Sequence, residues 1–460
     1  MYIQQIYTGC LAQAAYYIES QGEAAIIDPL RDIQIYLDIA EQRKANIKYI
    51  FETHFHADFI SGHIDLAKKT GAKVVFGPKA EAAYDIVIAE EGQKFAIGNH
   101  NIYVIHTPGH TLESSSFLAL DEKDSAIALF SGDTLFVGEV GRVDLAAQHY
   151  LSKEELASML YDSIEKLKKL PDDVILYPGH GPGSACGKNI GKETTSTIGE
   201  QKKRNYALQP MTREQFVKTM LTGLDTPPRY FFMDAVVNRK GYDNDVDSVV
   251  NKGVHPLNID EFKKEIDKGV IVLDTRNPVD FAKEHILGSI NIGLNGQYAI
   301  WAGSIFDNVP FILVCDDNKE KDSVMRLARV GYERVVGFLQ GGLKAWKDKG
   351  FKTQSIGSVS AKEFAGKLGK NDKVIDVRNA AEWTNGIVKD AITIPLSKLQ
   401  DNVSSLDKKA HYYVYCQGGY RSMIAASILQ SKGINNVTSI EGGMGAIAQT
   451  KVAIQVPEPV

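Results

Sequence analysis

An internal repeat in the C-terminal half constrains the fold of this chain more than any other feature. Residues 274–276 (Asp-Thr-Arg) recur as residues 376–378 (Asp-Val-Arg), and the apolar run that ends at Cys315 recurs at Cys416. Two further landmarks recur with the same offset of 101 or 102 residues. A constant offset over four landmarks predicts two copies of one small domain. In both copies short β-branched runs alternate with amphipathic stretches, which is typical of an α/β domain with a parallel sheet.

The length of 460 residues sets the number of domains. At about 150 residues each, the chain has room for about three. The segment 223–256, with its paired prolines and its Asn-Lys-Gly stretch, is typical of a connector. We place boundaries near residues 250 and 355, which gives domains at 1–250, 257–352 and 357–450. With 44% hydrophobic and 24% charged residues, the composition is typical of soluble globular proteins.

Charge and cysteine content exclude several classes of function. The net charge of −5 gives no indication of binding to nucleic acid or to an anionic membrane. No apolar run reaches the roughly 18–20 residues of a membrane span, and the first residues show no signal-peptide pattern. The four cysteines lie far apart and do not form a disulfide framework, which suits a reducing compartment. We therefore expect a cytoplasmic protein with no nucleic-acid or membrane partner.

Histidines are concentrated in the first 180 residues, which hold eight of the eleven. Four predicted strands there, at residues 48–53, 102–105, 126–130 and 174–177, each end in a turn rich in glycine or histidine. These turns carry imidazole and carboxylate groups, from His54, His56, Asp58, His110, Asp133 and His180. Because sites in α/β folds are built at strand ends, and because His and Asp ligate borderline divalent metals, the pattern predicts a metal site.

This order of motifs resembles the metallo-β-lactamase fold, over roughly residues 1–240. The resemblance implies an αββα sandwich in which His-x-His-x-Asp, Gly-His, Gly-Asp and Gly-His motifs surround the metal. In relatives with two metal ions, the first motif ends in a histidine that binds the second ion. Here that position is Phe59, which cannot ligate a metal, and this departure favours a single ion.

A single ion could be held in two ways. His54, His56 and His110 would form a three-histidine zinc site. His54, His110 and Asp133 would form the arrangement of two imidazoles and one carboxylate that is typical of non-haem Fe(II) enzymes. The residues alone do not choose between Fe(II) and Zn. The motifs contain three further candidates, which are His56, Asp58 and His180. We expect them either to support the metal ligands or to act as alternative ligands.

The Gly-Asp…Gly-Arg-x-Asp segment at residues 132–144 resembles persulfide dioxygenases. The resemblance implies that His54, His110 and Asp133 hold one Fe(II) per chain. It also implies that Arg142 contacts a thiol substrate. The alternative for Arg142 is a surface ion pair with the acidic residue two positions later.

Cys186 lies in a glycine-rich loop after the fourth of these strands, within residues 179–188. Glycines let the backbone approach a substrate closely, and a thiol near a divalent cation could be a thiolate that accepts a sulfur atom. Dioxygenases fused to sulfurtransferase domains resemble this loop. Cys186 is therefore a candidate substrate-contacting residue, with an inert loop thiol as the alternative.

In the second copy of the repeat, a strand ends at Cys416 and a glycine-bearing turn leads to Arg421 and a helix. Backbone N–H groups of such a turn, the helix N-terminus and the arginine all favour a thiolate. The Cys-x-x-x-x-Arg pattern resembles the rhodanese active-site loop, over about residues 357–450; a phosphatase loop would need one more residue. The resemblance implies sulfur transfer by Cys416 and Arg421, with substrate contacts from the turn residues Gln417, Gly418, Gly419 and Tyr420.

The first copy lacks these features. Its loop reads Cys315-Asp-Asp-Asn-Lys-Glu320, with an acid in place of the arginine and without glycines. The acids would raise the pKa of the Cys315 thiol and repel a sulfur oxyanion. We therefore expect residues 257–352 to form a degenerate rhodanese-like domain. It would serve in packing or dimerisation and would have no catalytic turnover of its own.

The order of the three domains resembles bacterial persulfide dioxygenase–sulfurtransferase fusions of sulfide detoxification. The resemblance implies that a thiol persulfide and O₂ are substrates, that sulfite is formed, and that the rhodanese step forms or uses thiosulfate. One alternative is a zinc-dependent thiolester hydrolase of the glyoxalase II type fused to a rhodanese. Another is a scaffold whose repeats relay sulfur to a partner protein. The carrier thiol stays open among glutathione, coenzyme A, bacillithiol and polysulfide, and we expect a homo-oligomer.

Overall fold

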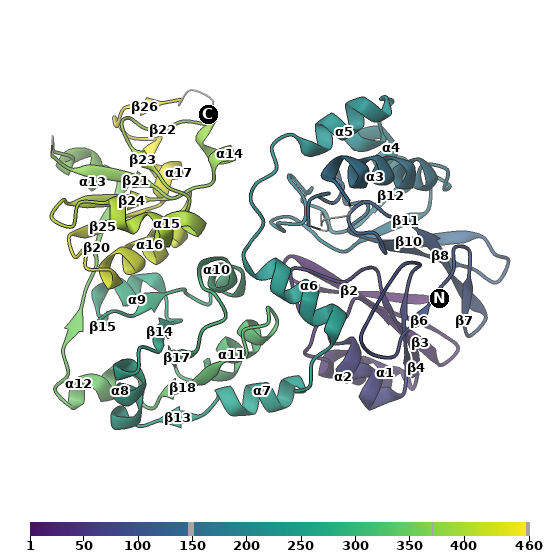
Figure 1. Cartoon of the computed structure of the whole chain (residues 1–460), viewed down its shortest axis with the longest axis horizontal. Coiled ribbons are helices and arrows are strands. Elements are labelled where there is room, and N and C mark those ends of the chain that lie inside the picture. The colour runs from purple at the N-terminus through teal and green to yellow at the C-terminus, as the bar shows by residue number, and fades with distance from the viewer. Residues whose placement is uncertain (146–150, 370, 457–460) are drawn as a thin grey trace. The chain divides into compact units, whose positions relative to one another are not determined.

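The computed structural model describes residues 1–145, 151–369 and 371–456, so His149 lies outside the described residues. The chain divides into two compact units. The first contains Met1–Val246 together with Ala328–Gly331, and the second contains Asp247–Leu327 and Tyr332–Val460. Figure 1 labels their helices and strands. Within the described residues, no helix is both long and apolar enough to span a membrane.

Two six-stranded sheets form the centre of the first unit, in the orders β1-β2-β3-β4-β5-β6 and β12-β11-β10-β9-β8-β7. Their strands are β1 (Tyr2–Thr8), β2 (Gln13–Ser20), β3 (Glu23–Ile27), β4 (Asn46–Glu52), β5 (Lys73–Phe76), β6 (Val87–Ile88), β7 (Lys94–Ile97), β8 (His100–His106), β9 (Ser115–Leu120), β10 (Ala126–Gly132), β11 (Ile175–Pro178) and β12 (Ser196–Thr197). The helices are α1 (Gln34–Arg43), α2 (His63–Thr70), α3 (Lys153–Leu167), α4 (Ile198–Arg204), the 3₁₀ turn η1 (Tyr206–Leu208), α5 (Arg213–Leu221) and α6 (Tyr230–Lys240).

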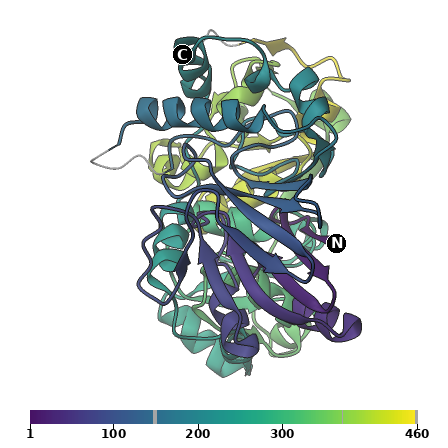
Figure 2. The same ribbon diagram turned by 90° about the vertical axis from the view of Figure 1, so that its right-hand side faces the viewer.

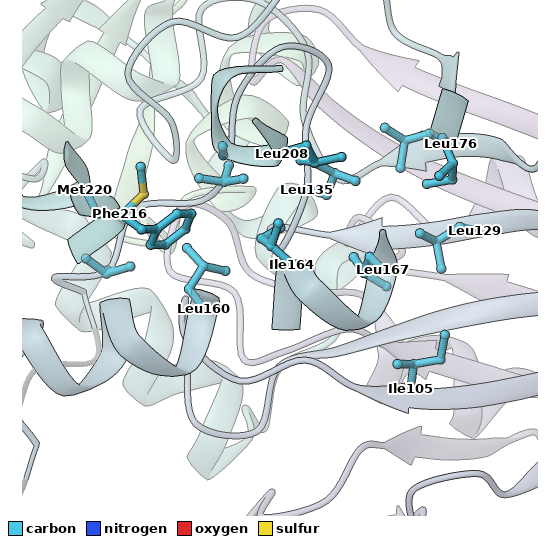
Figure 3. Packing of buried hydrophobic residues seen from close by; sticks show 14 of the residues in the cluster. Ile105, Leu129, Leu135, Leu160, Ile164, Leu167, Leu176, Leu208, Phe216 and Met220 are labelled. Carbon is cyan, nitrogen blue, oxygen red and sulfur yellow. The ribbon is translucent and has the colours of Figure 1, made fainter. Parts of the chain in front are cut away.

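The two sheets pack face to face, with helices on both outer faces. Side chains of both sheets share one buried cluster, in which the rings of Phe51 and Phe117 lie 4.8 Å apart. A second cluster joins α1 and α2 to the outer face of the first sheet. A third joins α3 and α5 to the outer face of the second sheet (Figure 3). This is the predicted αββα sandwich.

Helix α3, the long helix in Figure 2, shows how the sequence dictates one of these layers. Ser152 and Glu155 form a capping box at its start, which satisfies backbone N–H groups that the helix leaves unpaired. Leu156, Leu160 and Ile164 recur at helical spacing and are buried against the sheet. At about 25 cal/mol per Å², burial of such side chains contributes about 1.5–3 kcal/mol each.

The second unit contains two five-stranded parallel sheets with the same topology. The orders β13-β18-β17-β14-β16 and β20-β25-β24-β21-β23 correspond strand for strand, which confirms the internal repeat and its parallel sheets. The first copy contains β13 (Pro256–Leu257), α8 (Ile259–Asp267), β14 (Ile271–Asp274), α9 (Pro278–Lys283), β15 (His285–Ile286), β16 (Ile290–Asn291), α10 (Tyr298–Ile305), β17 (Phe311–Val314), α11 (Glu320–Ala328), β18 (Val335–Leu339), α12 (Gly342–Asp348) and β19 (Thr353–Gln354).

The second copy repeats this series of elements. It contains β20 (Gly357–Ser360), α13 (Ala361–Lys367), β21 (Lys373–Asp376), α14 (Ala380–Trp383), β22 (Ile387–Val388), β23 (Ile392–Thr393), η2 (Leu396–Lys398), α15 (Leu399–Asn402), η3 (Val403–Ser405), β24 (Tyr412–Tyr415), α16 (Tyr420–Ser431), β25 (Val437–Glu441), α17 (Gly443–Ile447) and β26 (Ile454–Gln455).

One part of the predicted organisation is corrected by the structure. The sequence suggested a plain connector over residues 223–256, because of its paired prolines and its Asn-Lys-Gly stretch. The structure has two helices there, α6 and α7 (Val246–Gly253). Tyr230, Phe231 and Val249 are buried, so apolar side chains of this segment pack as ordered helices do.

Candidate metal centre and cysteine loop

The strand ends that the sequence singled out meet inside the first unit. His54 follows β4, His110 lies in the turn after β8, Asp133 follows β10 directly and His180 lies after β11. All four side chains are at most 2% exposed. Three of them form one group, because the donor atoms of His54, His110 and Asp133 lie within 4.8 Å of one another. Asp133 Oδ2 is 3.5 Å from His110 Nε2 and 3.9 Å from His54 Nε2.

The two imidazoles of this group are oriented by contacts of their other ring nitrogen. His110 Nδ1–H donates to the Arg142 carbonyl at 2.8 Å. Thr53 Oγ1 donates to Asp28 Oδ2, so it accepts from His54 Nδ1–H at 2.9 Å. Each ring therefore presents the lone pair of Nε2 to the other donors. Such outer contacts fix the tautomer and orientation of metal-ligating histidines.

The buried donor atoms fit a divalent metal ion. Among the described residues, His54 Nε2 and both Asp133 carboxylate oxygens have no hydrogen-bond partner, an arrangement that is costly without a ligand. Burial and the neighbouring imidazoles hold the pKa of His54 well below its usual value. The ring is therefore neutral, which is the form that binds metals.

His56 lies beside His54, with ring centroids 4.3 Å apart, but its Nε2 faces two carboxylates. Its Nε2 lies 3.1 Å from Asp28 Oδ1 and 3.4 Å from Glu52 Oε2. Although burial opposes the charged form, these carboxylates raise the pKa of His56 well above its usual value. Phe59 is fully buried and stacks on the His56 ring with centroids 4.3 Å apart. His56 is thus paired with carboxylates, and Asp133 accompanies the two histidines.

Asp58, His180 and Cys186 form a second group of buried donors next to the first. His180 Nε2 lies 3.3 Å from Asp58 Oδ2 and 3.5 Å from Asp133 Oδ1. Burial and the carboxylates of Asp58 and Asp133 raise the pKa of the Cys186 thiol well above its usual value. The thiolate that we expect beside a divalent cation stays a prediction.

Arg142 is held by the protein in a way that the sequence predicted only in part. Its guanidinium donates to both carboxylate oxygens of Asp144, at 2.6 and 2.8 Å, and to the carbonyls of Ala185 and Asp225. The ion pair with Asp144 forms as the alternative predicted, but both side chains are buried, so the predicted surface position is wrong. The contact between Arg142 and a thiol substrate stays a prediction.

Two glycines of the motifs are required by close approach to Asp133. A Cβ at Gly141 would lie 1.9 Å from the Asp133 carbonyl oxygen, and a Cβ at Gly179 would lie 2.7 Å from Asp133 Oδ1. A side chain at Gly141 would displace the Asp133 main chain, and one at Gly179 would displace its carboxylate. Both positions must therefore be glycine if Asp133 is to keep its place in the metal group.

The sequence did not single out two residues that support the metal group, Asp28 and Thr53. Asp28 follows β3 just as Asp133 follows β10, so its position at a strand end could have indicated its place near the metal group. Nothing in the sequence indicated the role of Thr53, because its hydroxyl contributes only through hydrogen bonds with His54 and Asp28.

In the second unit, Cys416 lies between β24 and α16 as predicted, and its side chain is 1% exposed. The Gly419 N–H donates to Cys416 Sγ at 3.1 Å. Gly419 has a φ of 103° and precedes the first residue of α16, a conformation that only glycine adopts without strain. Gln417 and Gly418 are exposed, which suits contact with a substrate.

Two residues of this loop have partners that the sequence did not indicate. The Arg421 guanidinium forms two hydrogen bonds with the Glu382 carboxylate, at 2.6 and 2.7 Å. The Tyr420 hydroxyl donates to the Gly293 carbonyl of the first copy at 2.7 Å. Tyr420 thus packs on the other copy, whereas substrate contact was predicted for it. The Asn-x-x-Glu pattern of the capping box at α14 could have indicated that Glu382 lies at the start of a helix.

In the first copy, the pKa of Cys315 is raised to about 11. Burial is the main cause, and Asp274 and Glu320 contribute. The raised pKa of Cys315 confirms the predicted direction. Burial of the thiol has a larger effect on this pKa than the acids of the loop. A thiol with such a pKa is almost entirely protonated at neutral pH, which leaves it a poor nucleophile.

Comparison with known proteins identifies the architecture. The model of the metallo-beta-lactamase superfamily matches residues 8–180, and that of the rhodanese-like domain matches residues 258–349 and 360–450. A crystal structure described as a metallo-beta-lactamase from Staphylococcus aureus subsp. aureus COL is 31% identical, with a TM-score of 0.66. The match covers 74% of this chain and 98% of that one. The chain belongs to the metallo-beta-lactamase superfamily.

Within this superfamily, the chain combines a metallo-beta-lactamase domain with two rhodanese-like domains that follow it. The beta-lactamase hydrolase-like protein of Agrobacterium fabrum is 31% identical over 43% of this chain and 49% of its own length. The hydroxyacylglutathione hydrolase of Rhizobium johnstonii is 34% identical over 35% of this chain and 57% of its own length. The chain thus spans about half the length of the curated relatives that it matches.

Proposed function

We propose that the chain is a non-haem iron persulfide dioxygenase coupled to a rhodanese-type sulfurtransferase. The observation that carries the proposal is the buried group of His54, His110 and Asp133, whose donor atoms lie together. Two imidazoles and one carboxylate are the ligand set of Fe(II) enzymes that activate dioxygen. The same chain carries a cysteine loop suited to sulfur transfer, which connects the metal centre to sulfur chemistry.

The overall conversion fixes what the metal centre has to accomplish. A thiol persulfide, O₂ and water become a thiol, sulfite and two protons, so the terminal sulfur is oxidised and dioxygen is reduced. When bound, Fe(II) would supply the redox chemistry. The imidazoles of His54 and His110 and the carboxylate of Asp133 would hold the ion. Because all three are buried, bulk water has little access to the persulfide sulfur.

The cysteine loop would carry out the second step. A persulfide on Cys416 gives its outer sulfur to sulfite, so a sulfur–sulfur bond to Cys416 breaks and one in thiosulfate forms. The reverse step charges Cys416 from thiosulfate. Gly419 N–H donates to Cys416 Sγ, and Arg421 supplies a cation beside it. Both features stabilise the negative charge that returns to the Cys416 sulfur when the outer sulfur leaves.

A second candidate function is a zinc-dependent thiolester hydrolase of the glyoxalase II type. The similarity to hydroxyacylglutathione hydrolase favours it, as does the presence of Asp58 and His180 beside Asp133. A zinc ion held by these residues would activate a water molecule for attack on a thiolester carbonyl. Phe59 counts against it, because this position offers no imidazole to a second zinc ion.

The two functions differ in the metal and in the consumption of O₂. Samples of the full chain loaded with Fe(II) or with Zn(II) are given a low-molecular-weight persulfide and, separately, a thiolester. We expect O₂ uptake and sulfite only from the iron sample with persulfide, and no thiolester hydrolysis. Thiolester hydrolysis by the zinc sample without O₂ uptake by the iron sample would instead establish the hydrolase.

A further inference from the structure

The only basic residue of the cysteine loop at 416–421 is held by a carboxylate for which the proposed reaction has no use. Arg421 Nη1 donates to Glu382 Oε2 at 2.6 Å, and Nη2 donates to Oε1 at 2.7 Å. Two parallel hydrogen bonds of this kind are among the strongest contacts that an arginine makes. The side chains of Arg421 and Glu382 are 16% and 30% exposed, so water reaches the pair only in part. The two groups therefore form one ion pair beside Cys416.

Glu382 is fixed in place by its own helix. It is the third residue of α14, and its Oε2 also accepts from the Asn379 N–H at 3.0 Å in the capping box of that helix. Although burial opposes the charged form, the hydrogen bonds from Arg421 lower the pKa of the Glu382 carboxyl. The carboxyl is therefore ionised at neutral pH, and its negative charge stays at one place beside the loop.

The ion pair changes the charge that a substrate of the loop meets. Although burial opposes its charge, Glu382 raises the pKa of Arg421, and Cys416 raises it further. One guanidinium thus lies next to both a carboxylate and the reactive sulfur. Its Nη1–Nη2 edge, the part of an arginine that binds oxyanions in a bidentate way, is used by Glu382. The positive charge that Arg421 offers to an incoming anion is therefore largely offset.

Sulfur oxyanions and thiol persulfides differ in the charge that they bring to this loop. Thiosulfate is a dianion whose sulfonate oxygens are bound by arginine and by backbone N–H groups. The sulfur–sulfur group of a thiol persulfide is at most a monoanion. A carboxylate repels an incoming anion in proportion to the charge of that anion. Glu382 thus opposes the binding of the oxyanion more than that of the persulfide.

We propose that Glu382 is a specificity-determining residue, which offsets the charge of Arg421 and so weakens the binding of sulfur oxyanions relative to thiol persulfides. The inference rests on the proposed sulfurtransferase step and names the class of sulfur donor that the loop prefers. Cys416 accepts sulfur from a thiol persulfide in preference to thiosulfate. In this step the sulfur–sulfur bond of the donor breaks, a new one to Cys416 Sγ forms, and the carrier thiol leaves with the electron pair.

Sulfate is a suitable probe, because it is a sulfur oxyanion that transfers no sulfur. In the full chain, sulfate slows the alkylation of Cys416 by iodoacetamide at constant ionic strength, and mass spectrometry of the peptide that contains Cys416 reports the rate. Glu382→Gln removes the carboxylate charge and keeps an acceptor for the capping box. We expect half-protection in this variant at a sulfate concentration about tenfold lower than in the wild type. A disturbed fold would not raise the affinity for an anion.

Glu363→Gln is the matched control, because Glu363 has the same position in the capping box of α13 and its Oε2 accepts from Ser360. We expect it to leave protection by sulfate unchanged. In turnover with thiosulfate as donor and cyanide as acceptor, KM for thiosulfate should fall about tenfold in Glu382→Gln. KM for a low-molecular-weight thiol persulfide should change by less than about threefold.

Gln417→Arg provides a second test if Glu382→Gln fails to fold, because Gln417 is exposed in the same loop and the substitution adds a positive charge there. We expect sulfate to protect Cys416 at lower concentration in this variant too. Unchanged or weaker protection in either variant, or equal tightening in Glu363→Gln, would overturn the inference. Protection needs no turnover, so tighter sulfate binding without sulfur transfer would refute the transferase and leave the charge effect of Glu382 in place. Sulfur transfer with unchanged sulfate binding in Glu382→Gln would refute only this inference.

Discussion

At the scale of single residues, the metal group depends on three donors at strand ends and on the partners that orient them. The sequence left two ligand sets open, His54 and His110 with either His56 or Asp133, and the resemblance to persulfide dioxygenases implied the second. The structure places the donor atoms of the second set within 4.8 Å of one another. That such residues gather could be predicted, because sites in α/β folds are built at strand ends.

The ion pair of Arg142 with Asp144 could be predicted from their spacing. The contacts of Arg142 with the Asp225 carbonyl and of His56 with Asp28 could not, because these partners meet only through tertiary folding.

Thr53 gives a residue-scale prediction about orientation. Thr53→Val keeps the shape of the side chain but removes the hydroxyl that accepts from His54 Nδ1–H. We expect metal affinity at the first position to fall about 10–100-fold, as it does when outer contacts of ligating histidines are lost. A competition titration with a metal chelator measures this. Thr70→Val, which alters a threonine bonded only within and just after α2, should leave the affinity unchanged; equal affinity in both variants would contradict the role of Thr53.

At the scale of secondary-structure elements, the sequence predicted the strands that carry the site. The expected strands at 48–53, 102–105, 126–130 and 174–177 correspond to β4, β8, β10 and β11. Strands such as β1 and β9 were not predicted, because nothing in their sequence distinguishes them from other short apolar segments. The tight turn between β24 and α16 was predicted, because its glycines and its cysteine form a specific pattern.

Gly418 and Gly419 give a matched pair of variants in this turn. Gly419 has a φ of 103°, whereas a Cβ at Gly418 would meet no atom within 4 Å and its φ is not positive. We expect Gly419→Ala to cost about 1–2 kcal/mol of stability and to weaken the bond from this N–H to Cys416 Sγ, so that thiosulfate sulfurtransferase activity falls. Gly418→Ala should be nearly neutral. Denaturant unfolding and a transferase assay measure both effects, and equal behaviour of the two variants would argue against a role of the Gly419 N–H in holding Cys416 Sγ.

At the scale of the whole molecule, repetition and domain order were the strongest sequence signals. The two copies have corresponding strand orders, as the constant offset predicted. The contacts between these copies in the second unit could not be read from the sequence. His285 lies 2.8 Å from the Gln430 amide, Ser427 accepts from the Asn291 N–H, and Tyr420 donates to Gly293. The degenerate copy thus supports the loop of the other copy.

Tyr420 tests whether this support contributes to stability. Tyr420→Phe removes the hydroxyl that donates to the Gly293 carbonyl, and we expect the second unit to lose about 1–2 kcal/mol of unfolding free energy. Tyr298→Phe is the control, because the Tyr298 hydroxyl is buried without a hydrogen-bond partner in the described part of the chain. Its removal should cost little or stabilise the unit. Equal losses in the two variants would show that the contact between copies is unimportant.

The central claim is that His54, His110 and Asp133 hold an iron ion that oxidises persulfide sulfur with O₂. The most direct measurement is O₂ uptake by Fe(II)-loaded full-length protein given a low-molecular-weight persulfide. Its controls are Asp133→Ala and His106→Ala, since the His106 ring contacts only the Leu112 carbonyl among the described residues. The account predicts rapid uptake with sulfite or thiosulfate formed, lost in Asp133→Ala and retained in His106→Ala. No uptake by a verified iron-loaded sample across several persulfides would contradict it.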